Sequence, residues 1–417
     1  MAIVAAMAVP HPPIILPEIG RGEEKKIAKT AAAYREVMRR AADLEPDTVV
    51  ITSPHATMYS DYFHISPGKS ARGDFSAFRC PEVEIEAEYD AAFSKALADA
   101  CAEEDLPAGF LGEREPALDH GTMIPLYFLQ PALKKPVKVV RIGLSGLAAD
   151  VHYRLGRLIK DTAEKLGRRT VFIASGDLSH KLKEDGPYGF AKEGPVFDEA
   201  VTEDLGKADF LSLLTISPDL AECAAECGLR SFWIMAGALD CQRVHAELLS
   251  HEGTFGVGYG VAYFTPEGED DARDIGRQLI DAETQAIARV REQEDAYVRL
   301  ARESLETFAR SHTMLPVPKD LPEDLQDRRA GCFVSIKKDG RLRGCIGTLA
   351  PGRRNLAEEI ICNAVSAGMH DPRFPQVTPD ELPKLVYDVD VLSEPEPIDS
   401  PKELDVKRYG VIVQNGE

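Results

Sequence analysis

Four segments in the first part of the chain are hydrophobic almost throughout, and each has the length of one buried β-strand. They occupy residues 2–9, 48–53, 137–144 and 170–175, and residues 259–264 have the pattern of a last strand. Between the first two, residues 21–43 place hydrophobic side chains at helical spacing, at Ile27, Ala31, Tyr34, Met38 and Ala41. Buried strands that alternate with amphipathic helices predict an α/β domain with a mostly parallel central sheet and helices on both faces.

The pattern changes beyond residue 265. Residues 266–274 are rich in glycine and acidic side chains, which favours a domain boundary, and a helix with one apolar face follows (Tyr297, Ala301, Leu305, Phe308). Short β-like runs at 331–337 and 385–392 then indicate a compact α+β domain. We expect a first domain at 1–265, a linker and the start of a connecting helix at 266–290, and a smaller domain at 291–417. Because the chain stops soon after an apolar run, we expect the smaller domain to be incomplete at its C-terminus.

Charge and composition narrow the class of protein. The 417 residues include 49 basic and 69 acidic side chains, a net charge of −20, which disfavours binding to nucleic acid or to anionic membrane surfaces. The hydrophobic N-terminus lacks the basic residues of a signal peptide and runs into proline and histidine, so we expect a cytoplasmic protein. The eight cysteines lack the paired spacings of a disulfide scaffold or a zinc ribbon, which favours reduced thiols.

Three histidines lie just beyond a predicted strand or in the turn after it. His11 comes after AIVAAMAV, His55 after TVVITS, and His180 after TVFIAS. Ligands of open α/β sheets bind in the crevice outside the carboxyl ends of the strands, so we expect these imidazoles to lie together. Each histidine by itself would more often be a hydrogen-bonded structural residue, whereas the shared position of all three favours a site.

Two imidazoles and one carboxylate form a typical Fe(II) site that leaves coordination positions open. We expect His11 and His55 to be two of the ligands and Glu226, just before the apolar helix SFWIMAGAL, to be the third. A glutamate near a helix start equally serves as a partner of the helix dipole. Cys227 is an alternative ligand, and a thiol there would suit zinc or copper better than iron.

At these positions the sequence resembles the class III extradiol ring-cleavage dioxygenases of the catalytic-subunit type, over about residues 1–265. The matching motifs are VPHPP with His11, SPHAT with His55, LDHGTMIPL with His120, GDLSH with His180 and AECGLRSFWIMAGAL with Glu226. The resemblance implies Fe(II), O2 and a small aromatic diol as substrate. His180 would then be the base, His120 the proton donor, and Asp177 would orient His180. The related Memo proteins, with a cysteine in place of the carboxylate, look like the same fold.

A second resemblance begins near residue 295. RLRGCIGTLAP (341–351), DPRFPQVTPDEL (371–382) and VLSEPEPI (391–398) are similar to the AMMECR domain. The pairing of the two domains resembles the AmmeMemoRadiSam system, which implies a radical SAM protein as a partner. Candidate site residues here are Arg343, Gly344, Cys345, Asp371 and Arg373. Packing of the glycine-rich segment, a buried unreactive thiol and a braced turn are the competing interpretations of these five residues.

Two other functions of the first domain remain open from the sequence. One is a metal-binding redox or interaction module that has kept the site without turnover. The other is a zinc-dependent hydrolase that uses the same ligands.

Overall fold

A computed structural model describes the chain apart from residues 1, 339, 397–399, 401–409 and 411–417. The chain divides into two compact units, Met1–Ile280 and Asp281–Glu417, and the division falls inside helix α10 (Ile275–Glu292). This position lies within the region 266–290 that we expected to join two domains. The expectation of a missing C-terminal portion concerns residues that lie outside the described part of the chain.

The first unit is built on a six-stranded sheet with the order β7-β2-β8-β1-β10-β9. The four predicted hydrophobic segments form its parallel part, namely β1 (Ile3–Val9), β2 (Thr48–Ser53), β7 (Lys138–Gly143) and β8 (Thr170–Ser175). Strands β10 (Tyr259–Glu269) and β9 (Gln242–Glu252) complete the sheet in antiparallel pairing. The prediction of a mostly parallel sheet is confirmed.

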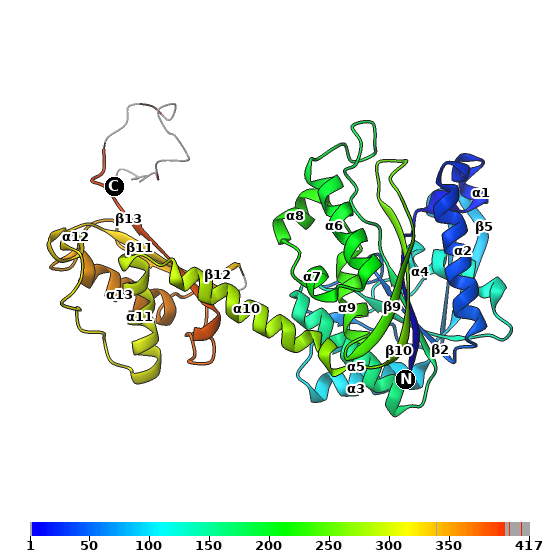
Figure 1. The fold of residues 1–417 in the computed structure, drawn as a ribbon, viewed down its shortest axis with the longest axis horizontal. Helices are drawn as coiled ribbons and strands as arrows, with labels where there is room; N and C mark the ends of the chain where they lie inside the picture. Colours follow the sequence, from blue (N-terminus) through cyan, green and yellow to red (C-terminus); the bar gives the residue numbers. More distant parts are fainter. Residues whose placement is uncertain (1, 339, 397–399, 401–409, 411–417) are drawn as a thin grey trace. The chain divides into compact units, whose positions relative to one another are not determined.

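Helices cover both faces of this sheet (Figure 1), as predicted. Alternate residues of β1 point to different cores: Ala5 and Met7 pack with α2 (Ala28–Asp43) and α4 (His120–Leu129). Ala6 and Ala8 pack instead with α3 (Ala91–Glu103), α5 (Ala149–Lys165), α6 (Glu193–Lys207) and α9 (Leu229–Ala238). Burial on both faces explains why the parallel strands are hydrophobic without alternation.

Shorter elements connect these layers. They are η1 (Pro13–Ile15), α1 (Pro17–Gly20), η2 (Glu23–Ile27), β3 (Phe63–His64), β4 (Ser70–Phe75), η3 (Ser76–Phe78), β5 (Cys80–Glu88), β6 (Ala108–Gly109), η4 (Gln130–Ala132), α7 (Phe210–Leu214), α8 (Pro218–Ala224) and η5 (Asp271–Arg273). Residues 266–269, where we expected the domain boundary to begin, still belong to the sheet, because β10 continues through Pro266 to Glu269 in pairing with β9. Proline is tolerated in a strand where its nitrogen needs no ladder partner.

The second unit has the predicted α+β character. Strands β12 (Arg341–Gly347), β11 (Cys332–Lys338) and β13 (Leu385–Val391) form an antiparallel sheet in that order. Helices α11 (Ala296–Ser311) and α13 (Leu356–Met369) pack on it, with Leu300, Val334 and Ile360 in the shared core. The short elements α12 (Glu323–Asp327) and η6 (Leu382–Lys384) complete the described part.

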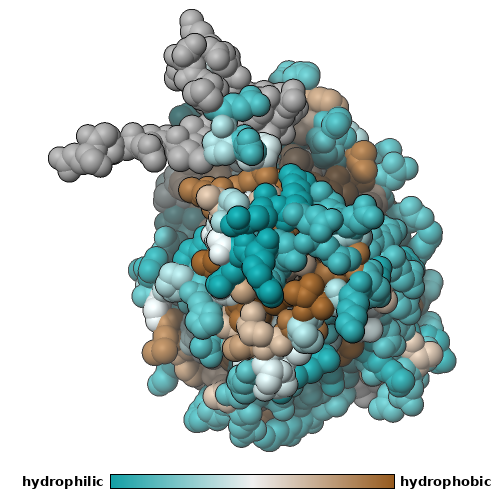
Figure 2. Space-filling model, turned by 90° about the vertical axis from the view of Figure 1, so that its left-hand side faces the viewer, coloured by the Kyte–Doolittle hydropathy of each residue, from teal (hydrophilic) through white to brown (hydrophobic). Residues whose placement is uncertain are grey.

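One face of the molecule can be compared with the high content of charged residues in the sequence. The face drawn in Figure 2 is mainly hydrophilic, with small separate hydrophobic patches. Within the described residues we find no helix with the length and apolar character needed to cross a membrane.

Candidate functional site

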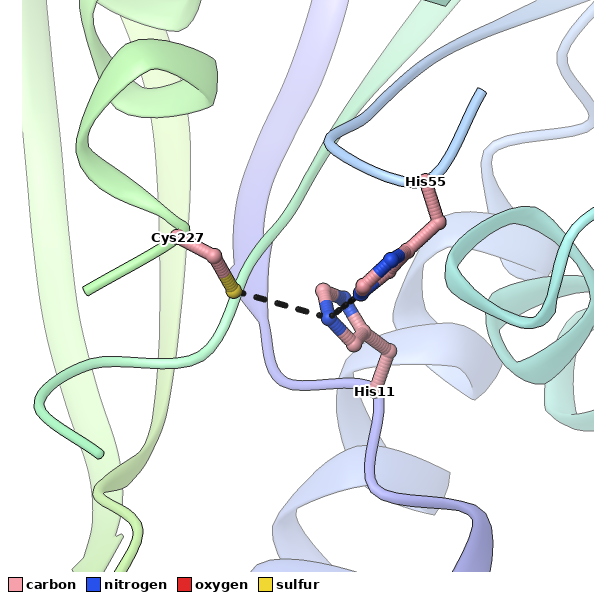
Figure 3. A group of neighbouring side chains, drawn as sticks. All are labelled: His11, His55 and Cys227. Carbon is pink, nitrogen blue, oxygen red and sulfur yellow. Dashed lines mark hydrogen bonds between the residues drawn. The ribbon is translucent and has the colours of Figure 1, made fainter. Parts of the chain in front are cut away.

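Three adjacent strands bring the first two predicted ligands together. The order β2-β8-β1 places the carboxyl ends of these strands side by side, and His11 and His55 follow two of them. The Nε2 atoms of His55 and His11 lie 3.0 Å apart, with the rings nearly perpendicular (Figure 3). His11 is buried, whereas His55 is exposed at the cavity. Two imidazole nitrogens aimed at one point are the arrangement that a cation requires.

A serine hydroxyl fixes the tautomer of His11. Ser175 Oγ donates its single proton to the carbonyl of Gly121 (2.6 Å), so it can only accept from His11 Nδ1, at 2.9 Å. His11 therefore carries its proton on Nδ1 and keeps a lone pair on Nε2, the atom that faces His55. An outer hydrogen bond of this kind is typical of metal-ligating histidines.

The third ligand atom near this pair is sulfur. Cys227 Sγ lies 3.6 Å from His11 Nε2, and the ligand atoms of His11, His55 and Cys227 all lie within 4.8 Å of one another (Figure 3). The carboxylate of Glu226 instead accepts a hydrogen bond from Leu229 N (2.6 Å) in the first turn of α9. The structure thus favours Cys227, the alternative ligand, over our first choice Glu226. Two consecutive residues in the turn before a helix point in different directions, and only one of them faces the histidines.

The loops that carry Cys227 and Asp177 are in direct backbone contact. A side chain at Gly176 would place its Cβ 2.1 Å from the Cα of Gly228, so only glycine permits this approach. Asp177 N donates to Cys227 Sγ (3.3 Å). Through this contact, Asp177, His180 and Cys227 form a second group of possible ligands within 4.8 Å, adjacent to the first.

Asp177 lies between two histidines. Its Oδ1 accepts a hydrogen bond from the backbone N of His11 (2.8 Å), and its Oδ2 lies 3.9 Å from Nε2 of both His11 and His180. His180 donates its Nδ1 proton to the carbonyl of Ala225. This leaves the Nε2 of His180 as a proton acceptor that faces the site. The distance of 3.9 Å between Asp177 and His180 is longer than a hydrogen bond, so orientation of His180 by Asp177 stays a prediction.

His120 is the first residue of α4, and its ring lies 4.0 Å from the ring of His55 and 5.1 Å from that of Phe78. Burial, followed by the proximity of His55 and His11, lowers the pKa of His120 to about 3. Its imidazole is therefore neutral at physiological pH and can give only a neutral N–H to a bound molecule.

Burial shapes the protonation of the other candidate ligands. It lowers the pKa of His11 and of His55, which keeps both imidazoles neutral, as metal ligation requires. Burial raises the pKa of Asp177, and burial together with Asp177 raises that of the Cys227 thiol. A bound cation would oppose both of the latter effects, because it stabilises thiolate and carboxylate.

The three histidines near the strand ends, His120 and Asp177 line a cavity of about 610 Å³. His11, His55, His120, Asp177 and His180 form its polar wall, and Phe78, Tyr188, Phe255, Val257 and Tyr259 contribute much of the rest. Lys183 and Asp185 lie at the same cavity. A cavity of this size and mixed lining suits a small molecule.

Sequence reasoning missed the polar residues that hold the histidines. Ser53 and Ser175 end their strands in otherwise apolar runs, and Asp119 begins α4 opposite the buried Arg141. Burial by itself would raise the pKa of Asp119, but Arg141 together with hydrogen bonds from Ser53 and Thr122 lowers it. The sequence feature that could have revealed them is a serine at the end of a hydrophobic strand, two residues before a candidate ligand.

The candidate residues of the second unit form two ion pairs. Arg373 binds Asp371 through two contacts (3.0 and 2.8 Å), and Asp371 also accepts from Cys345 N. Arg343 pairs in the same way with Glu381, which we had not singled out. A Cβ at Gly344 would lie 2.2 Å from the carbonyl of Ala367, so packing against α13 explains this glycine.

Imidazole and carboxylate side chains line a cavity at the carboxyl ends of the parallel strands, with a thiol close by, and this arrangement is typical of α/β domains that bind a metal. Residues 5–262 match the family described as the catalytic LigB subunit of aromatic ring-opening dioxygenase, and the chain belongs to this family. Residues 298–417 match the AMMECR1 family. Both resemblances predicted from sequence motifs are thereby confirmed.

Relatives share one or both parts. A protein of Clostridium acetobutylicum is 39% identical over 426 residues, which cover 100% of this chain and 90% of that protein. A protein of Thermotoga maritima is 50% identical over 124 residues, 30% of this chain and 71% of its own length. Among solved structures, an uncharacterized protein from Escherichia coli K12 aligns with a TM-score of 0.44 and 16% identity, over 63% of this chain and 99% of that one.

Proposed function

We propose that the first unit is a metal-dependent dioxygenase that opens the ring of a small aromatic diol with O2. The observation that carries the proposal is that the ligand atoms of His11, His55 and Cys227 lie within 4.8 Å of one another, while both histidines line the 610 Å³ cavity. His180 and His120 line the same cavity, so the proposed base, a neutral hydrogen-bond donor and the two histidine ligands would face one bound molecule. The family match to ring-opening dioxygenases supports this reaction class.

His11, His55 and Cys227 would hold the metal, for which we propose Fe(II). Bound Fe(II) would act as a Lewis acid toward the diol and supply electrons toward O2. His180 is suited to accept a hydroxyl proton at Nε2, since its Nδ1 is committed to Ala225. His120 can donate a hydrogen bond to the ring-opening species from its position beside His55. Both oxygen atoms of O2 enter the opened product, so the reaction needs no external reductant.

The thiol of Cys227 supports a second candidate function. A His2Cys set binds Cu or Zn at least as well as Fe(II), which favours a metal-binding redox module of the Memo type or, with zinc, a hydrolase. The radical SAM partner and the cytoplasmic location both remain predictions from the sequence.

The test is anaerobic reconstitution of the full chain with Fe(II), Zn(II) or Cu(I), followed by metal analysis and by oxygen uptake with a panel of catechols. We expect Fe(II)-dependent oxygen uptake that His11→Ala abolishes, because it removes a ligand. His245→Ala, an exposed histidine on β9, is the matched control and should behave as wild type. Tight Zn or Cu binding with no oxygen uptake would reject the dioxygenase in favour of the redox module, and hydrolysis without oxygen would identify the zinc enzyme.

A further inference from the structure

A single buried carboxylate, that of Asp119, connects the segments that carry His55 and His120. Its Oδ1 accepts hydrogen bonds from Ser53 Oγ (2.6 Å) and from Thr122 N (3.0 Å). Its Oδ2 accepts from Thr122 Oγ1 (2.8 Å) and from Arg141 Nε (3.1 Å). The side chain of Asp119 is 8% exposed and that of Arg141 only 1%, so water contributes little to this arrangement.

A chain of two hydrogen bonds connects Asp119 through Ser53 to the backbone of His55. Ser53 Oγ gives its only proton to Asp119, so its lone pair accepts the backbone N–H of His55, at 3.2 Å. Ser53 is the last residue of β2, and His55 lies two residues further on. Asp119 therefore reaches the backbone of His55 through one hydroxyl.

The same carboxylate caps the helix that begins with His120. Asp119 is the N-cap of α4 and holds Thr122 N, which fixes the first turn. The rings of His55 and His120 lie 4.0 Å apart, and His55 Nε2 lies 3.0 Å from His11 Nε2. A change at Asp119 is thus transmitted to two histidines of the cavity without contact to any bound molecule.

We propose that Asp119, acting through Ser53, is a positioning residue that sets the place of the His55 imidazole relative to His11 and Cys227, and thereby the affinity of the site for a metal. Buried Arg141 contacts Oδ2 of the same carboxylate through Nε (3.1 Å) and Nη2 (2.9 Å). The inference rests on the proposed metal site, and it is independent of whether ring opening is the reaction.

The experiment compares two variants that each remove one hydroxyl from the same carboxylate. Ser53→Ala breaks the link to His55, whereas Thr122→Val removes the Oγ1 contact and keeps the backbone cap. Both hydroxyls belong to fully buried residues, so the variants are matched for burial. Co(II) alone is titrated into the metal-free full chain, with its d–d and thiolate charge-transfer absorption as the readout. Thermal unfolding checks that each variant folds.

We expect Ser53→Ala to weaken Co(II) binding by about 10-fold or more and to shift the absorption bands, as loss of an outer hydrogen bond does in metal sites. Thr122→Val should bind as wild type, and Ser53→Thr should restore the binding because it keeps the hydroxyl. Should Ser53→Ala not fold, Asp119→Asn tests the link from its other end, with weaker binding expected.

Three results would overturn the inference. They are unchanged affinity and spectrum in Ser53→Ala, equal losses in Ser53→Ala and Thr122→Val, and failure of Ser53→Thr to restore binding. If the wild-type chain binds no Co(II), the metal site and this inference fail together. If it binds Co(II) but opens no ring, only the proposed reaction fails, and the comparison of variants still supports or rejects the role of Asp119.

Discussion

The candidate site residues of the first and the second unit differ in how many of their polar atoms are already bound to a partner. In the second unit, Arg373 is paired with Asp371 and Arg343 with Glu381, each through two contacts. In the first unit, the outer nitrogens of His11 and His180 are committed to Ser175 and Ala225, while their Nε2 atoms face the cavity. Charged side chains that are fully paired with one another stabilise the fold. Imidazole nitrogens that are held in place with a lone pair toward the cavity can bind a metal or another ligand.

The largest effect is expected when Cys227, the proposed sulfur ligand of the first unit, is replaced. Cys227→Ser should strongly reduce the metal content of the purified full chain, because a serine hydroxyl is a much weaker metal ligand than a thiolate. Glu226→Gln should keep the metal, since its side-chain oxygen can still accept from Leu229 N. Metal analysis of both variants measures the effect. Normal metal content in Cys227→Ser together with loss in Glu226→Gln would restore our first choice of ligand.

Substitution of His180 should lower the turnover rate and leave the metal content unchanged. His180→Ala is expected to lower the turnover of the reconstituted enzyme by about 10²- to 10⁴-fold, the contribution typical of a general base. Oxygen uptake and metal analysis on the same sample measure both quantities. Because Asp177, His180 and Cys227 also form a group of possible ligands, loss of metal from this variant would assign His180 to the metal instead.

The smallest effect belongs to the second unit and depends on pH. Hydrogen bonds from Arg343 lower the pKa of Glu381 from its ordinary 4.5 to about 2. A lowered pKa stabilises the fold above the unfolded value, and this stability is lost as the pH falls from about 4.5 toward 2. Glu381→Gln should therefore cost about 1–2 kcal/mol at neutral pH, as loss of a charge-assisted hydrogen bond does, and less at pH 3.

Urea unfolding, with hydrogen exchange of β12 as a local probe, follows this change. Asp388→Asn is a suitable control, because the Lys337–Asp388 pair is about half exposed on both sides and should contribute little. A cost in Glu381→Gln that does not vary with pH would show that the ion pair is not its cause.

Much of the first unit follows from the sequence because its strands are buried on both faces. Unbroken hydrophobic runs predicted β1, β2, β7 and β8, and parallel pairing then placed His11 and His55 after the ends of two strands that are separated only by β8. The antiparallel strand β9 was missed, since its two faces are unequally covered and its pattern is mixed. The predicted strand at 259–264 is shorter than β10, because Pro266 and the acidic residues after it are typical of a domain boundary.

The choice between Glu226 and Cys227 could not be made from sequence. Ala225 adopts a left-handed backbone conformation at the end of α8, with φ of 54°, and this turn decides which of the next two side chains faces His11. No residue type in the segment requires that conformation. The role of Asp119 was hidden for a similar reason, since its partners Ser53 and Arg141 lie on other strands.

The backbone contact between Gly176 and Gly228 has a thermodynamic consequence. The segment with Asp177 and His180 and the segment with Cys227 cannot shift independently, because no side chain separates them to absorb a displacement. A small molecule that moves His180 on binding would also move the sulfur atom. The affinity for that molecule and the affinity for the metal would then be linked, and each would change the other by the same factor.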